Sequence, residues 1–353
     1  MATVVLEHVT VSRPQATLLD DVDLTIGDGE LIGVVGASGA GKSTLLRAIA
    51  GVEPLAYGSI SIAGIDVTDM APGDRDVSMV FQTPQLLPHR DVRRNIALPL
   101  EFRHRPTDEI ALRVGAETRA LHIEALLARS PRDLSAGEAQ LVQVARALVR
   151  LPSVLLLDEP LAGLDASLTQ SMRVDLRTLQ QGYGVTTLMA TNDSVEAMSM
   201  PDRLVVLAAG RVVQIGTPID VYERPANLVA AACTGRLSTV VAAVETDGVG
   251  FWLVHPAFRY RVWQPALAAH VGGSVLVGFR PHWMQPANDG QVSAIVADAS
   301  PVVATTKVSL GDDPNGDEVE IASPGRGHRR GDRLSLRMEQ VVLFHPLSGE
   351  RLG

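Results

Sequence analysis

The feature that most constrains this sequence is a glycine-rich turn set between an apolar run and a helical pattern. The turn is made of Gly36, Ala37, Ser38, Gly39, Ala40, Gly41, Lys42, Ser43 and Thr44. It matches the P-loop pattern G-x-x-x-x-G-K-[ST] without a departure. The apolar run at residues 31–35 predicts a buried strand before the turn, and Leu45, Leu46 and Ile49 repeat at helical spacing after it.

This strand–turn–helix context predicts a nucleotide site. A strand that ends in glycines and turns directly into a helix lines up backbone N–H groups at a positive helix end, which cradles phosphate oxygens. Lys42 is expected to reach the β- and γ-phosphates, and the Ser43 hydroxyl to bind Mg²⁺. The alternative is a glycine-rich turn that matches by chance, and the flanking strand and helix patterns argue against it.

A pair of carboxylates follows a second apolar run. Residues 154–157 are wholly apolar, which predicts a strand buried on both faces of a parallel sheet. Asp158 and Glu159 follow, and because successive side chains point to opposite faces of a strand, the two can have different roles. Asp158 suits Mg²⁺ or its waters, and Glu159 suits the base that polarises water. The alternative is a solvated acidic turn.

Two shorter sequence features are weak by themselves and become informative next to a P-loop. Gln82 ends a strand pattern at residues 77–81, where it could hold Mg²⁺ or the attacking water. Ser135 is followed three residues later by Glu138, a capping box that predicts the start of a helix. By itself a capping box indicates a helix start and nothing more.

Composition excludes several classes of protein. The net charge of −9 argues against a nucleic-acid groove, which needs a basic surface. Cys233 is the one cysteine, so the sequence predicts no disulfide framework, no thiolate metal site and a reducing compartment. No apolar run approaches the ~20 residues of a membrane span. A role at a membrane would therefore be that of a bound subunit.

The length of 353 residues favours two domains. We expect an α/β P-loop NTPase domain at residues 1–235, which starts with half-exposed antiparallel strands and contains a helical subdomain at about residues 87–150. Residues 236–353 form a strand-rich remainder, with apolar runs such as 240–244, 275–279 and 302–308 between Gly, Pro and Asp. That pattern predicts an all-β barrel or sandwich.

Taken in order, these motifs resemble the ATP-binding subunit of an ABC transporter. Residues 36–44 resemble the Walker A loop, Gln82 the Q-loop, residues 134–140 the LSGGQ signature, residues 154–160 the Walker B strand, and Leu164 with Asp165 the D-loop. The resemblance implies ATP hydrolysis with Mg²⁺. It also implies that Ser135 and Gly137 of one subunit close on ATP held by the other subunit, with Asp165 among the nucleotide-binding residues.

The resemblance narrows to the sugar-importer ATPases related to the maltose transporter. It rests on residues 66–69 with 74–76, 216–218 with 222–227, 278–281 and 344–350. It implies an oligonucleotide-binding-like C-terminal barrel for regulation and dimer contacts, and import of a carbohydrate-like solute. The implied partners are membrane-spanning permease subunits, a second ATP-binding subunit (itself or a paralogue) and an extracytoplasmic solute-binding protein, with no nucleic acid. The implied location is peripheral, on the cytoplasmic face of the cell membrane.

This chain departs from the family pattern at several positions. Asn192 stands where a histidine usually meets the γ-phosphate, Arg13 where an aromatic ring usually stacks on adenine, and Ala136 and Glu138 replace Gly and Gln of the signature. Arg13 can still stack through its guanidinium, with an attraction of about 0.5–2 kcal/mol. Asn192 can donate a hydrogen bond but carries no positive charge. Slow hydrolysis is therefore expected.

Two alternatives stay open at this point. One is a degenerate, mainly regulatory ATP-binding subunit paired with a more active ATPase, which the departures favour and the intact Glu159 opposes. The other is a soluble ABC-type ATPase that works on nucleic acid or ribosomes, which the acidic balance opposes.

Overall fold

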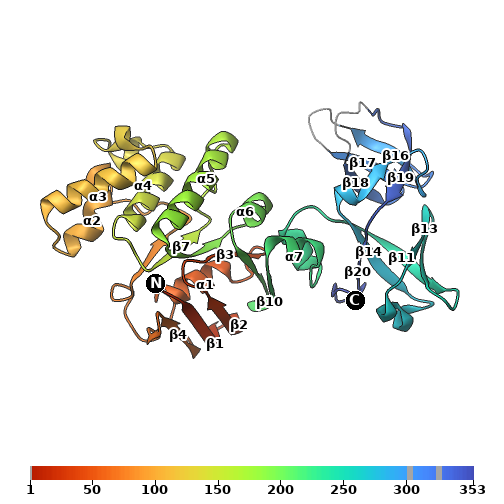
Figure 1. The fold of residues 1–353 in the computed structure, drawn as a ribbon, viewed down its shortest axis with the longest axis horizontal. Helices are drawn as coiled ribbons and strands as arrows, with labels where there is room; N and C mark the ends of the chain where they lie inside the picture. Colours follow the sequence, from red (N-terminus) through yellow and green to blue (C-terminus); the bar gives the residue numbers. More distant parts are fainter. Residues whose placement is uncertain (1, 300–304, 323–327) are drawn as a thin grey trace. The chain divides into compact units, whose positions relative to one another are not determined.

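The computed structural model describes residues 2–299, 305–322 and 328–353. Its contacts divide the chain into two compact units, Met1–Ile219 and Asp220–Gly353 (Figure 1). The break lies within the short helix α7 (Pro218–Glu223), earlier than the boundary expected between residues 235 and 236.

The first unit is built on a six-stranded sheet of order β10-β9-β3-β8-β7-β6, parallel except for the β9–β10 hairpin. Its strands are β3 (Leu31–Gly36), β6 (Val77–Val80), β7 (Val154–Asp158), β8 (Thr186–Ala190), β9 (Arg203–Ala208) and β10 (Arg211–Gly216). Every residue of β3, β7 and β8 is buried, as the apolar sequences of β3 and β7 predict. Because the carboxyl ends of parallel strands meet at one edge, the loops after these strands gather there.

A second, antiparallel sheet has the order β2-β1-β4-β5. Its strands are β1 (Val4–Arg13), β2 (Ala16–Ile26), β4 (Tyr57–Ile62) and β5 (Ile65–Asp66). Leu6, Val9 and Leu24 are buried, in one apolar cluster with Ile32 of β3 and Leu45 of α1 (Lys42–Ile49). The alternation of apolar and polar residues in this part of the sequence is therefore confirmed as one buried and one exposed face.

The helices α2 (Val92–Phe102), α3 (Thr107–Ala120) and α4 (Ala136–Leu148) lie together within residues 87–150 (Figure 1). They share an apolar cluster with α5 (Ala166–Tyr183), and the short helix α6 (Ser194–Ser199) follows β8. Proline is unfavourable inside a helix, but Pro99 lies inside α2. Asp91 caps α2 by accepting a hydrogen bond from the backbone N–H of Arg94.

The second unit has two antiparallel five-stranded sheets, of orders β13-β12-β11-β14-β20 and β15-β19-β16-β17-β18. Their strands are β11 (Ser238–Thr246), β12 (Phe251–His255), β13 (Phe258–Val262), β14 (Ser274–Phe279), β15 (Met284–Pro286), β16 (Val292–Ala299), β17 (Thr305–Leu310), β18 (Glu318–Ala322), β19 (Arg333–Met338) and β20 (Val342–Phe344). One apolar core joins both sheets, which confirms the expected all-β fold. Of the run expected at residues 302–308, residues 302–304 lie outside the described part.

Arg280, which is fully buried, explains why the break between the units falls early. Its Nη1 atom donates to the carbonyls of Ala231 at 2.9 Å and Gly235 at 2.8 Å, and its Nη2 atom donates to Thr234 Oγ1 at 3.0 Å. The guanidinium also lies 4.2 Å from the ring centre of Tyr222. These contacts bind the segment with α8 (Leu228–Cys233) to the strands of the second unit.

Candidate nucleotide site

The loop between β3 and α1 is held by its own lysine. Lys42 is buried, and its Nζ atom donates to the carbonyls of Gly36 at 2.9 Å and Ala37 at 3.1 Å. Gly41 has φ 105°, and a Cβ atom there would lie 2.8 Å from the carbonyl oxygen of Leu18. The backbone path of this loop therefore requires glycine, and the cation of Lys42 is held against the loop that is expected to carry phosphate.

Ser43 and Asp158 meet at the carboxyl edge of the parallel sheet. The Ser43 hydroxyl donates a hydrogen bond to Asp158 Oδ1 at 2.8 Å, although the two residues come from α1 and β7. Asp158 is buried, whereas Ser43 is partly exposed. The structure thus brings together a hydroxyl and a carboxylate, the oxygen donors that suit a hard cation such as Mg²⁺.

The carboxylate of Glu159 receives a hydrogen bond on each oxygen. Gln82 Nε2 donates to Oε2 at 2.8 Å, and Asn192 Nδ2 donates to Oε1. Glu159 has φ 47°, in the left-handed region, and its backbone N–H donates to the carbonyl of Ala190 in β8. The expected catalytic residues Glu159, Gln82 and Asn192 therefore lie together, from three different loops.

The loop that carries Asn192 is fixed by its neighbours. Thr191 Oγ1 donates to Glu196 Oε2 at 2.6 Å and accepts from the backbone N–H of Asp193 at 3.0 Å. Asp193 in turn caps α6 by accepting from the N–H groups of Val195 and Glu196. Burial raises the pKa of Glu196, and the nearby charge of Asp193 adds to that rise. The sequence analysis did not single out Thr191 or Glu196.

Ser135 and Gly137 of the signature and Asp165 of the D-loop have their contacts in the helical part of the first unit. Ser135 caps α4, with Glu138 completing the capping box, and Asp165 caps α5 by accepting from the N–H of Leu168 at 2.9 Å. Gly137 is buried, and a Cβ atom there would lie 2.8 Å from Leu164 Cδ2. Among the described residues, no hydrogen bond or ion pair joins Ser135, Gly137 or Asp165 to the P-loop.

Arg13 lies at the end of β1, beside the turn to β2, and is exposed. Its guanidinium is held by Glu53, with Nη2 at 3.0 Å from Oε2 and Nε at 3.2 Å from Oε1. Glu53 thus engages the edge of the guanidinium, which leaves the flat face as the part suited to stacking.

A cavity of about 360 Å³ opens beside the Glu159 carboxylate. Its lining comes from the loop after β7 with the first turn of α5, and from the loop after β8 with the first turn of α6. The lining residues are Glu159, Leu161, Ala162, Gly163, Leu164, Thr169, Thr191, Asn192, Asp193 and Glu196.

A buried glutamine ties α4 to the loop that carries Gln82. Gln143 Nε2 donates to the carbonyl of Phe81 at 2.8 Å, and Gln143 Oε1 accepts from the backbone N–H of Gln85 at 3.1 Å. Sequence reasoning missed this residue. The available signal was a polar residue between Val142 and Val144.

The comparisons with known proteins agree with this arrangement. The family model described as "ABC transporter" matches residues 19–162. The sn-glycerol-3-phosphate import ATP-binding protein UgpC 3 of Agrobacterium fabrum is 40% identical, over 98% of this chain and 98% of its own. The chain belongs to the ABC transporter family. The corresponding UgpC protein of a Ruegeria species is 39% identical over 100% of both chains.

Solved structures of ABC cassettes share the fold of this family member. A dimeric cassette, MJ0796, bound to ADP and Pi has a TM-score of 0.56 and 28% identity, over 61% of this chain and 98% of its own. The cbiO1 protein of Clostridium perfringens has a TM-score of 0.58 and 28% identity, over 63% of this chain and 90% of its own.

Membership of the ABC transporter family confirms the expected ATPase subunit that couples ATP hydrolysis to transport, rather than the degenerate alternative. It also confirms the expected setting, a peripheral subunit on the cytoplasmic face that works with permease subunits, a second ATP-binding subunit and a solute-binding protein. In the part of the chain that the structure describes, no helix has both the length and the apolar character to cross a membrane.

Proposed function

We propose that this ABC transporter subunit binds ATP through residues 36–44 and hydrolyses it with Glu159 as the base, to power import of a small polyol phosphate or a related carbohydrate-like solute. The observation that carries the proposal is the Glu159 carboxylate, which Gln82 and Asn192 hold beside the Ser43–Asp158 pair. A carboxylate next to a phosphate-binding loop is well placed to accept a proton from water that attacks the γ-phosphate.

Ser43 and Asp158 are the residues that would hold Mg²⁺. Their oxygens lie 2.8 Å apart, and both are of the hard oxygen type that this ion prefers. When bound, Mg²⁺ neutralises charge that develops on the phosphate oxygens. The side-chain oxygen of Gln82 would serve the cation or the attacking water, while its amide nitrogen orients Glu159.

Asn192 has two parts in this proposal. It orients Glu159 through its hydrogen bond, and it supplies a neutral donor where a charged or longer one would stabilise the transition state better. Turnover should therefore be slow but measurable. Arg13 would face adenine with its guanidinium plane, while Glu53 keeps that plane in place.

Ser135, Gly137 and Asp165 would act on the nucleotide of a second subunit. Ser135 and the first turn of α4 offer a hydroxyl and backbone N–H groups at a positive helix end, which suits a γ-phosphate. Their separation from the P-loop hydrogen bonds of their own chain, and the dimeric MJ0796 cassette, support this arrangement. Residues 236–353 would serve regulation and dimer contact.

The solute class rests on the relatives. Several proteins of similar length that are about as similar as UgpC 3 carry the name sn-glycerol-3-phosphate import ATP-binding protein. The test is to purify the chain with its permease subunits and binding protein, reconstitute the complex in vesicles, and measure ATP hydrolysis. We expect sn-glycerol-3-phosphate to stimulate hydrolysis several-fold, and glycerol or maltose to stimulate it less.

Two results would change this proposal in different ways. Stimulation by maltose and not by the phosphate ester would keep the ATPase site and replace the solute. Full hydrolysis by a complex that carries Glu159→Gln would remove the proposed base, whichever solute is transported.

A further inference from the structure

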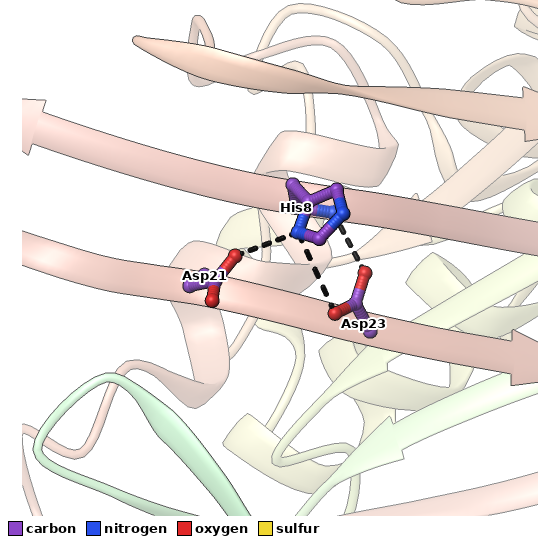
Figure 2. A group of neighbouring side chains, drawn as sticks. All are labelled: His8, Asp21 and Asp23. Carbon is purple, nitrogen blue, oxygen red and sulfur yellow. Dashed lines mark hydrogen bonds and ion pairs between the residues drawn. The ribbon is translucent and has the colours of Figure 1, made fainter.

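Outside the nucleotide site, three side chains that bind metals well converge on the exposed face of the antiparallel sheet. His8 comes from β1, and Asp21 and Asp23 come from β2 (Figure 2). His8 Nδ1 lies 2.8 Å from Asp21 Oδ1 and 3.7 Å from Asp23 Oδ2. One ligand atom from each residue can be chosen so that all three lie within 4.8 Å of one another.

Two β-bulges produce this convergence. Between two consecutive pairs of the β1–β2 ladder, β1 has Glu7 and His8 where β2 has Asp23 alone. At the next step β2 has Asp20 and Asp21 where β1 has a single residue. An extra residue in one strand re-aims its side chain, so His8 and Asp21 turn toward each other on the exposed face.

The bulges place His8 and Asp21 in the left-handed region, with φ 50° and 53°. Non-glycine residues adopt this region only where the surrounding structure holds them there. The backbone N–H of His8 donates to Asp23 Oδ1 at 2.8 Å, which fixes one of these carboxylates against the bulge. On the other side of β1, a Cβ atom at Gly58 would lie 2.4 Å from the His8 carbonyl oxygen, so glycine makes room for the bulge.

The charges around the three residues favour a cation. Within the described residues, His8 is the only group at ion-pair distance from Asp21 or Asp23. No lysine or arginine of the described residues lies at ion-pair distance from these two carboxylates, so their negative charge is open to a divalent ion.

We propose that His8, Asp21 and Asp23 bind one divalent transition-metal ion of the Zn²⁺ type. The bonds of a tetrahedral Zn²⁺ site are ~2.0–2.2 Å long, which separates its ligand atoms by ~3.4 Å. The observed separations from Nδ1, 2.8 Å and 3.7 Å, lie on either side of that value. Small side-chain rotations would therefore form the site without a change in the strands.

The ligand set also indicates which ions the site prefers. An imidazole with two carboxylates suits Zn²⁺ and neighbouring transition metals, whereas Mg²⁺ and Ca²⁺ favour oxygen ligands alone. The site is distinct in chemistry from the Ser43–Asp158 pair, where both ligand atoms are oxygens. Its three exposed protein ligands leave further positions for water.

The test is a calorimetric titration of the nucleotide-free full chain with ZnCl₂, for the parent and for His8→Asn, Asp21→Asn and Asp23→Asn. Asparagine tolerates the left-handed region and keeps the size of the aspartates, so the bulges should persist. We expect the parent to bind one ion more than each variant, or to bind it at least tenfold more tightly. The parent should also gain several degrees in Tm on adding Zn²⁺, and the three ligand variants should not.

His122→Asn is the matched control, because His122 is exposed, lies in the same unit and has φ 56°. It should bind Zn²⁺ as the parent does. The proposal is overturned if the parent binds no Zn²⁺, if His8→Asn binds as many ions with the same affinity, or if His122→Asn loses as much. Circular dichroism on each variant shows whether it is still folded, and so separates loss of a metal-binding side chain from loss of the fold. Asp23→Asn tests the site without altering His8 or Asp21, the two residues in the left-handed region.

Discussion

The side-chain amide of Asn192 donates a hydrogen bond to the carboxylate of Glu159. The two residues follow β8 and β7, neighbouring parallel strands whose registers place Asp158 opposite Ala190. The sheet thus places the two backbones side by side, and the short loops after β7 and β8 bring the carboxylate and the amide into contact. Substitution of either residue should therefore change ATP hydrolysis, and kinetic measurements can separate the effect on kcat from the effect on ATP binding.

Replacing Asn192 by histidine should raise kcat and leave ATP affinity about the same. Histidine adds reach and can carry a positive charge, and both help most in the transition state. A missing donor of this kind costs ~2.7–4 kcal/mol, and asparagine replaces part of it, so we expect a gain of about tenfold. Asn192→Ala is the control and should be slower than the parent. If Asn192→His is slower than the parent both alone and in the transport complex, this position does not contact the γ-phosphate.

Glu159→Gln should keep ATP bound and lower kcat by about 10²–10⁴-fold. The amide is nearly isosteric, but it cannot accept the proton of water. Steady-state hydrolysis and size-exclusion chromatography with ATP measure the two effects, and the variant should elute as a stable dimer. Glu196→Gln is a matched control, because Glu196 lines the same cavity and glutamine keeps its size and an acceptor for the Thr191 hydroxyl. Equal losses in both variants would point to a general disturbance of the loop.

Lys42→Ala should weaken ATP binding by about ten- to hundredfold, the loss of ~1.5–3 kcal/mol that a hydrogen bond to a charged group contributes. The fold should persist, since Lys42 bonds only the carbonyls of Gly36 and Ala37 in its own loop. Titration with a fluorescent ATP analogue gives the affinity. Lys307→Ala, in the second unit, is the control and should bind ATP normally. Unchanged binding by Lys42→Ala would show that residues 36–44 are not the phosphate loop.

Glu117→Gln should make stability less dependent on pH. Burial raises the pKa of Glu117, so its contribution to stability is complete below the pKa of the unfolded chain and is lost as pH rises through the folded pKa. Glutamine keeps an acceptor for the Tyr183 hydroxyl, which donates to Glu117 at 2.8 Å. At pH 7.5 the variant should be more stable by about 1 kcal/mol, and Tm should vary less between pH 5 and 7.5 than in the parent. Glu124→Gln, at an exposed site, should match the parent.

Periodicity and motif order were enough to predict the parts of the fold that position the site. The runs that became β3 and β7 are apolar because both faces of the sheet are covered, so the P-loop and the Asp158–Glu159 pair lay at strand ends that the sequence already marked. From the order of the motifs we could predict that Glu159, Gln82 and Asn192 lie near one another, but not which hydrogen bonds join them. Which amide bonds which oxygen depends on side-chain directions that no spacing encodes.

Other elements were missed for physical reasons. Proline is unfavourable inside a helix, yet α2 tolerates Pro99 because packing in the helical cluster outweighs one lost backbone bond. The role of Gln143 could not be predicted from the sequence, because it depends on a carbonyl that is distant in sequence. The bulges at His8 and Asp21 did leave a signal in the sequence, because the buried residues are three apart from Leu6 to Val9 and from Leu19 to Val22, where strict alternation spaces them by two.

The burial of Arg280 has a consequence for anyone who expresses the C-terminal unit by itself. A fragment that starts at residue 236 lacks the carbonyls of Ala231 and Gly235 and the ring of Tyr222, and so leaves a cation inside the protein without most of its partners. Water cannot replace them unless the fragment opens around that position. A fragment that starts at residue 218 keeps these partners of Arg280. It should therefore express as a folded protein, whereas the shorter fragment should aggregate.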